Sequence, residues 1–95
     1  MYTVYPTKTF KKSYRKYWRS GRLSKTADAK LARAVTLLSE SKNLTKEFSD
    51  HALKGVFQGY RECHIGGDVL LVYLRDTENC TVTLVDIGTH AELFG

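Results

Sequence analysis

The sequence predicts a domain of the α+β class, in which two helices precede a β-sheet. Before residue 45, two basic segments carry apolar side chains at the spacing of amphipathic helices. After residue 50, short segments rich in β-branched and aromatic residues are separated by turn sequences. Helices that precede strands, without alternation, indicate α+β. A chain of 95 residues has room for one hydrophobic core, so we expect a single domain over residues 1–95.

The chain begins with a segment typical of a short strand, residues 1–5, followed by its one proline, Pro6. Proline is favoured in the first turn of a helix, so we expect a helix to begin there and to end near Gly21. Its aromatic side chains recur at i, i+4, i+7 and i+8 and predict a buried stripe: Phe10, Tyr14, Tyr17 and Trp18.

A second helix is expected to begin after Ser24 or Thr26, either of which suits an N-cap, and to end at residues 40–42. Asp28 would lie near the positive end of its dipole. The predicted buried stripe consists of Ala27, Leu31, Ala34, Val35 and Leu38. Both stripes are too narrow for the helices to bury each other completely, so both should pack on a sheet.

Four segments of the second half are typical of strands: LKGVF at 53–57, GYRECHI at 59–65, VLLVYLR at 69–75 and CTVTLVDI at 80–87. The sequences IGGD and RDTEN supply turns between the last three. Consecutive strands joined by short turns form an antiparallel meander. We therefore predict a twisted antiparallel sheet of about four strands.

Charge is distributed unevenly along the chain. Residues 1–50 hold 12 Lys and Arg against 4 Asp and Glu, whereas residues 51–95 hold 3 against 6. This asymmetry points to a polyanion or an acidic protein as the partner of the basic half, although a solvated helix face explains it equally well.

No segment has the apolar run of a signal peptide or membrane span, so we expect a cytoplasmic protein without membrane association. In a reducing cytosol, Cys63 and Cys80 are expected to be free, buried thiols. No Cys or His pair has the close spacing of a zinc site, and no dinucleotide or P-loop fingerprint is present. We therefore expect neither a metal nor a cofactor.

All three histidines, His51, His64 and His90, lie beside turns or strand ends, where functional side chains are common. Because a meander brings strand ends together, His64, Asp68 and His90 could converge on one edge of the sheet. Histidine can donate or accept a proton near neutral pH, and RNA supplies its own nucleophile in the 2′-OH. A converged group would suit metal-free RNA cleavage. The alternative is three unrelated surface histidines.

Three motifs in order, DHALKG, GYRECHIGGDVLLVY and GTHAELFG, resemble the YafQ-like branch of the RelE/ParE toxin superfamily. The resemblance covers residues 50–95 closely and the first half in pattern only. It implies a RelE-like fold and the toxin half of a type II toxin–antitoxin module. Such a toxin is a metal-independent endoribonuclease that cleaves mRNA on the ribosome. Its partners would be a cognate antitoxin, the ribosome and mRNA, and it would reach promoter DNA only through the antitoxin complex.

Carried over by motif, the residues of cleavage and substrate placement are His51, His64, Asp68, His90 and Phe94. His64 or Asp68 would be the general base and His90 the general acid. His51 would orient the scissile phosphate or share the proton transfer, and Phe94 would stack on a base. Contacts to RNA are expected from seven basic residues: Lys11, Lys12, Arg15, Lys16, Arg19, Lys54 and Arg61.

Two positions depart from the family pattern. Asp86 stands four residues before His90, where relatives often carry an arginine, and Val69 stands where the best-known members carry tryptophan. A cation is expected to stabilise the transition-state phosphate, and Lys54, Arg61 or another basic side chain would have to replace the missing one. Two other functions therefore stay open: a ParE-like toxin that binds gyrase, and a weakened toxin that acts only as an antitoxin-binding partner.

Overall fold

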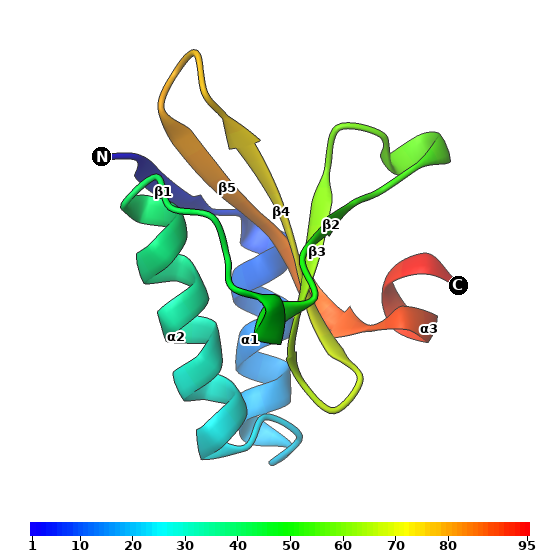
Figure 1. Cartoon of the computed structure of the whole chain (residues 1–95). Coiled ribbons are helices and arrows are strands. Elements are labelled where there is room, and N and C mark those ends of the chain that lie inside the picture. Colours follow the sequence, from blue (N-terminus) through cyan, green and yellow to red (C-terminus); the bar gives the residue numbers. More distant parts are fainter.

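A computed structural model describes all residues, 1–95, as two helices packed on one face of a five-stranded sheet (Figure 1). The strands are β1 (Thr3–Pro6), β2 (His51–Ala52), β3 (Arg61–Gly66), β4 (Val69–Asp76) and β5 (Thr81–Thr89). The helices are α1 (Lys8–Arg19), α2 (Lys25–Ser39) and the short α3 (His90–Phe94). Two 3₁₀ turns, η1 (Lys46–Phe48) and η2 (Gly55–Phe57), flank β2. The α+β class is confirmed.

The sheet has the order β1-β5-β4-β3-β2. Strands β2 to β5 form the predicted antiparallel meander. At the other edge β1 pairs in parallel with β5, with Thr3 opposite Thr81, so the sheet is mixed. Residues from the two ends of the chain thus lie side by side in it.

Side-chain caps begin both long helices. The Thr7 side chain accepts a hydrogen bond from the backbone of Phe10, and the Ser24 side chain accepts one from Ala27. The choice of Ser24 over Thr26 is thereby settled, and α2 ends where predicted, with Glu40 as its C-cap. Pro6 ends β1 and does not enter α1, because Thr7 provides the cap.

The core lies between the helices and the sheet. Phe10 and Tyr17 of α1 and most of the predicted α2 stripe are buried there against alternate residues of β3, β4 and β5. Trp18 departs from the prediction: its side chain is 51% exposed at the margin of the α1 stripe. Val35 is only partly buried.

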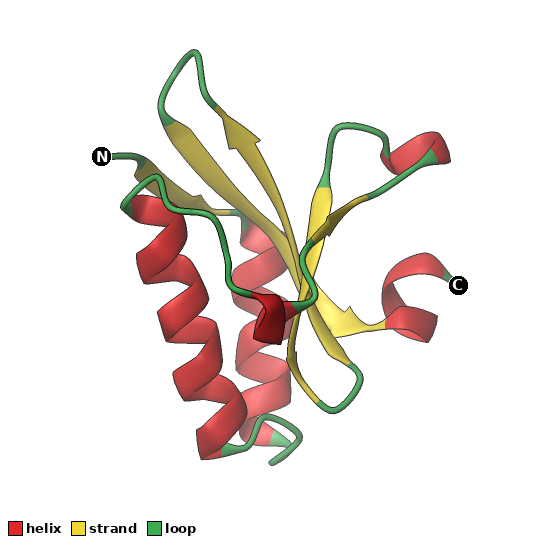
Figure 2. Cartoon of the chain, viewed as in Figure 1, coloured by secondary structure: helices red, strands yellow, loops and turns green.

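Three further features differ from expectation. The LKGVF segment is not a strand, because Gly55 adopts φ +67° and starts the η2 turn. Strand β2 lies just before it and has only two residues. The sequence GTHAELFG contains the unpredicted helix α3, visible in red at the C-terminal end in Figure 2. Both cysteines are free as expected, but only Cys63 is buried, since Cys80 sits exposed in the β4–β5 turn.

None of the helices has the length and apolar character needed to cross a membrane.

Candidate functional site

The candidate site lies on the sheet face opposite α1 and α2. Along β3, Cys63 and Ile65 enter the core between sheet and helices. Successive strand side chains point to opposite faces, so Glu62 and His64 lie on the other face. In Figure 2 the η2 turn and α3 both lie away from the two long helices, next to this face. We refer to it as the open face.

The three histidines come together on the open face. The ring centroids of His51 and His64 are 6.5 Å apart, and those of His64 and His90 are 5.9 Å apart. The rings come from three elements, β2, β3 and α3. Phe94 continues the row, with its ring centroid 6.1 Å from that of His90. The predicted convergence of His64 and His90 is therefore present, on a face of the sheet and not at its edge.

A buried carboxylate underlies this histidine row. Glu62 is 3% exposed and is the only charged residue in the buried set. Its Oε1 atom lies 2.7 Å from His51 Nε2 and 3.5 Å from His90 Nε2. The other oxygen, Oε2, is buried without a hydrogen-bond partner. Glu62 thus connects two histidines from opposite ends of the site through one oxygen.

Both ring nitrogens of His51 are occupied. Nδ1 lies 3.0 Å from the Ser49 carbonyl oxygen, which can only accept, so Nδ1 donates. Nε2 faces the Glu62 carboxylate, 2.7 Å from its Oε1 atom. The His64 ring makes no hydrogen bond or ion pair within the chain. Of these two rings, His64 is the one with nitrogens free to exchange a proton.

Helix α3 positions His90, and α3 is tied to the first half of the chain. Thr89 and Glu92 form a capping box at its N-terminus. The Glu92 carboxylate also accepts a hydrogen bond from the Tyr17 hydroxyl at the end of α1. It forms an ion pair with Arg22 in the α1–α2 loop, at 3.3 Å. The basic half of the chain therefore fixes where His90 stands.

Asp68 lies apart from the histidine row. It is exposed in the β3–β4 turn and lines a hollow on the helix side, together with Arg22 and Lys30. Neither a hydrogen bond nor an ion pair connects it to a histidine. Its predicted role stays untested, and the geometry favours His64 over Asp68 as the proton acceptor.

Arg61 and Lys54, the two cations considered as replacements for the missing arginine, differ in whether an acidic side chain binds them. Arg61 is engaged by Asp50, with Nη2 and Oδ2 2.9 Å apart, and this hydrogen bond raises the pKa of Arg61. The Asp50 carboxylate also accepts from the Tyr73 hydroxyl, whose pKa is raised chiefly by burial. Lys54 is exposed beside η2 and has no acidic partner. Lys54 is the freer of the two.

The basic residues of α1 form a continuous exposed surface. Four of them, with Ser20, line a shallow hollow of about 560 Å³ that contains no acidic or apolar residue: Lys12, Arg15, Lys16 and Arg19. Lys11 is exposed on the same helix. None of the five forms an ion pair. Unpaired cations on one helix favour a polyanion over a self-neutralised surface.

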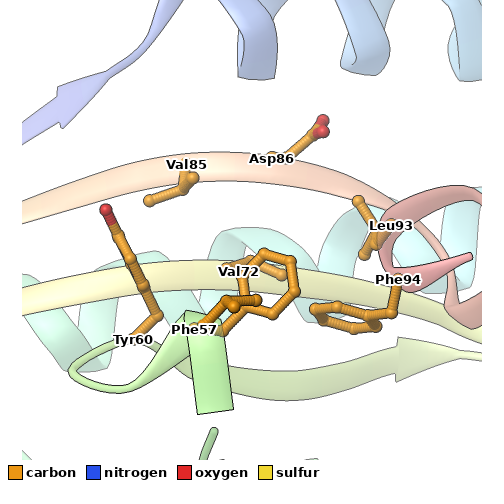
Figure 3. A pocket seen from close by; sticks show the side chains of 8 residues that line it. Phe57, Tyr60, Val72, Val85, Asp86, Leu93 and Phe94 are labelled. Atoms are coloured by element: carbon orange, nitrogen blue, oxygen red, sulfur yellow. The ribbon is translucent and has the colours of Figure 1, made fainter. Parts of the chain in front are cut away.

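An apolar hollow of about 330 Å³ adjoins the histidine row between η2 and α3 (Figure 3). Phe57 and Phe94 meet there edge to face, with centroids 5.0 Å apart. The remaining lining residues are Val56, Tyr60, Val72, Val85, Asp86 and Leu93. The hollow places aromatic surface directly beside the histidines.

Asp86 stands at the rim of this hollow. In Figure 3 its carboxylate points away from the two phenylalanine rings. One oxygen, Oδ1, accepts a hydrogen bond from the backbone of Ile87, at 2.8 Å. Strand β1 ends opposite Leu84, so the Asp86 carboxylate satisfies a backbone donor where β1 has stopped. The acid is thus held by the neighbouring backbone and turned away from the two phenylalanine rings.

Sequence reasoning missed Glu62 and Phe57. Glu62 lies two residues before His64, so strand alternation could have placed both on one face. Nothing local indicated that the face would be covered well enough to bury a carboxylate. Phe57 was assigned to a strand, and that error concealed its position opposite Phe94.

Comparisons with known proteins agree with the fold. The family model of the bacterial toxin of type II toxin–antitoxin systems, YafQ, matches residues 2–95. The mRNA interferase toxin YafQ of Escherichia coli K12 is 36% identical over 67 residues, 70% of this chain and 71% of that protein. A putative toxin YafQ from Haemophilus influenzae is 42% identical over 45 residues. That match spans 47% of this chain and only 44% of the relative.

Solved structures match over nearly the full length. A copper-bound mutant toxin from Helicobacter pylori gives a TM-score of 0.87 at 35% identity, covering 99% of this chain and 100% of the other. YafQ from E. coli BL21(DE3) gives 0.85 at 26% identity, with both chains fully covered. The E. coli DinJ–YafQ complex gives 0.83 at 27% identity, again with full coverage of both chains.

Proposed function

Since the chain belongs to the YafQ family of toxins of bacterial type II toxin–antitoxin systems, we propose that it is an endoribonuclease that cleaves mRNA on the ribosome. A cognate antitoxin would hold it inactive, as the complex of the E. coli relative with DinJ suggests. The observation that carries the proposal is the convergence of three histidines around the buried Glu62 carboxylate. This arrangement offers proton donors and acceptors within the span of one phosphodiester.

In the proposed reaction His64 is the general base. It removes the proton of the ribose 2′-OH, and the 2′-oxygen attacks the adjacent phosphorus. The bond between phosphorus and the 5′-oxygen breaks, and His90 gives that oxygen a proton. The products are a 2′,3′-cyclic phosphate and a 5′-hydroxyl end. Base and acid each contribute about 10²- to 10⁴-fold to the rate.

Glu62 acts as a positioning residue in this scheme. Its carboxylate orients His51 and His90, and so holds the scissile phosphate and the proton donor in register. His51, whose two ring nitrogens face Ser49 and Glu62, orients the phosphate and does not exchange protons. We assign part of the missing arginine's role to Lys54, the unpaired cation next to η2.

The basic surface of α1 would bind ribosomal RNA. Contacts between Lys or Arg and phosphate carry no sequence information and weaken steeply with salt. Neutralising Lys12, Arg15, Lys16 and Arg19 together should lower ribosome affinity and flatten its salt dependence. Ribosome affinity that is insensitive to salt would contradict this assignment.

Cell-free translation of a defined mRNA tests the proposal. Purified protein, its His90→Ala variant and a control, Glu78→Ala in the exposed β4–β5 turn, are added, and new 5′ ends are mapped by primer extension. We expect codon-registered cuts with the wild type and the control but not with His90→Ala. Protein stripped of metal before addition should cleave at the same rate.

The competing functions make different predictions. A gyrase-binding toxin would leave mRNA intact and inhibit DNA supercoiling. A toxin that has lost its activity through Asp86 would leave mRNA intact but still bind antitoxin. The histidine row favours the nuclease, because a protein that only binds has no need of a buried carboxylate beneath three imidazoles.

A further inference from the structure

The apolar hollow between η2 and α3 gives the site a second part. We propose that it binds the nucleobase of the nucleotide at the cleaved phosphate, and that Phe57 forms a stacking wall of this subsite together with Phe94. The inference rests on the proposed function, since it takes single-stranded RNA as the ligand. It adds a binding residue, Phe57, and it assigns the phosphate to the histidine row and the base to the hollow.

The lining of the hollow favours a base over a phosphate. Seven of its eight residues are hydrophobic, and the remaining one is Asp86. The lining offers no cation to a phosphate, whereas its apolar walls suit the flat faces of a base. The edge of a base carries hydrogen-bonding groups with which the Tyr60 hydroxyl can pair. The phosphate would then lie over the histidines and the base in the hollow.

The position and size of the hollow agree with this division. Phe94 and His90 lie on one turn of α3, with ring centroids 6.1 Å apart, so base and phosphate subsites adjoin as they do in a nucleotide. A volume of about 330 Å³ lies at the small end of the range for ligand pockets. The edge-to-face contact of Phe57 and Phe94 leaves ring faces on which a base can stack.

The η2 turn is built to present Phe57. Gly55 and Gly59, which lie two residues before and after Phe57, adopt φ +67° and +100°, conformations that glycine permits and larger residues resist. Phe57 is partly buried against α3, while Gln58 next to it is exposed and does not line the hollow. Gln58 therefore offers a matched control within the same turn.

The kinetic prediction separates binding from chemistry. Phe57→Ala should raise the KM for mRNA-loaded ribosomes by about 5- to 150-fold, the range for loss of one base-stacking contact. The kcat should change little, because His64 and His90 are untouched. Phe57→Trp should restore the wild-type KM, and Gln58→Ala should leave both constants unchanged. A Phe57→Ala protein with wild-type KM, or one that Phe57→Trp fails to rescue, would overturn the assignment.

A binding experiment tests the subsite without cleavage. The full chain is titrated with a 2′-deoxy trinucleotide, which lacks the nucleophile, and with its counterpart that lacks the central base, while the Phe57, Phe94 and histidine ring signals are followed by NMR. We expect phenylalanine shifts with the first ligand only. Equal phenylalanine shifts with both ligands, or none with either, would refute the base subsite. Base-dependent shifts in a protein that leaves mRNA intact would support the subsite and refute the nuclease.

Discussion

Replacing Glu62 by glutamine should lower activity without lowering stability. The substitution keeps the side chain's shape but removes the charge that faces His51 at 2.7 Å and His90 at 3.5 Å. A hydrogen bond to a charged group contributes about 1.5 to 3 kcal/mol and a neutral one about 0.5 to 1.5 kcal/mol. The difference, about 1 to 1.5 kcal/mol for the His51 contact, corresponds to a fall in kcat/KM of about tenfold. Stability does not fall with it, because a neutral amide costs less to bury than a carboxylate whose Oε2 atom has no partner.

The stability expectation follows from the burial of Glu62. Its Oε2 atom has no hydrogen-bond partner, and leaving a buried polar group unsatisfied costs about 1 to 3 kcal/mol. The histidine side chains that it contacts are 54% and 58% exposed, so water can solvate them when the carboxylate is gone. Glu62→Leu should therefore be at least as stable as the wild type and nearly inactive.

The assay measures both quantities on each variant. Single-turnover cleavage of ribosome-bound mRNA gives the rate, and urea denaturation gives the free energy of unfolding. Glu78→Gln, an exposed carboxylate in the β4–β5 turn, serves as the control and should change neither. Cleavage by Glu62→Gln at the wild-type rate would refute the positioning role. A loss of rate matched by a loss of unfolding free energy would show that Glu62 is only structural.

Other predictions concern stability and thiol reactivity. Gly66→Ala should destabilise the protein by about 1 to 3 kcal/mol in urea denaturation, because the new Cβ would lie 2.8 Å from the Ala27 Cβ. The Cβ of Gly67→Ala meets no neighbour, so this variant should lose about 1 to 2 kcal/mol through backbone strain alone. A thiol reagent at pH 8 should label Cys80 quickly and Cys63 only after unfolding, since burial raises the pKa of Cys63 to about 12. The same shift predicts that the free energy of unfolding falls as pH rises from about 9 to 12, by up to about 1.4 kcal/mol per pH unit, because the native state retains a proton that the unfolded thiol releases. A pH-independent free energy of unfolding over that range would contradict it.

The elements with strong local patterns were predictable from the sequence. Helix α2 has a clean apolar stripe and a serine cap, and its bounds agree with expectation. The antiparallel strands β3 to β5 are separated by turns whose residues are diagnostic. In these cases neighbours in sequence are also neighbours in space, so the local pattern is enough to predict the helix or strand.

What depends on distant residues could not be predicted in the same way. The pairing of β1 with β5 joins residues almost 80 positions apart, and no local signal indicates it. The composition of LKGVF favours a strand, but Gly55 turns the chain instead. The histidines were visible as candidates, whereas Glu62 looked like an ordinary surface carboxylate until its neighbours were in place.

The place of β5 in the sheet has a consequence for when the candidate site forms. This strand lies between β1 and β4, and the residues that follow it directly carry His90 and Phe94. During synthesis, neither the parallel β1–β5 pair nor the histidine row can form until residues 81–94 have emerged. The histidine row therefore forms late in folding, after the long helices and the other strands have been synthesised.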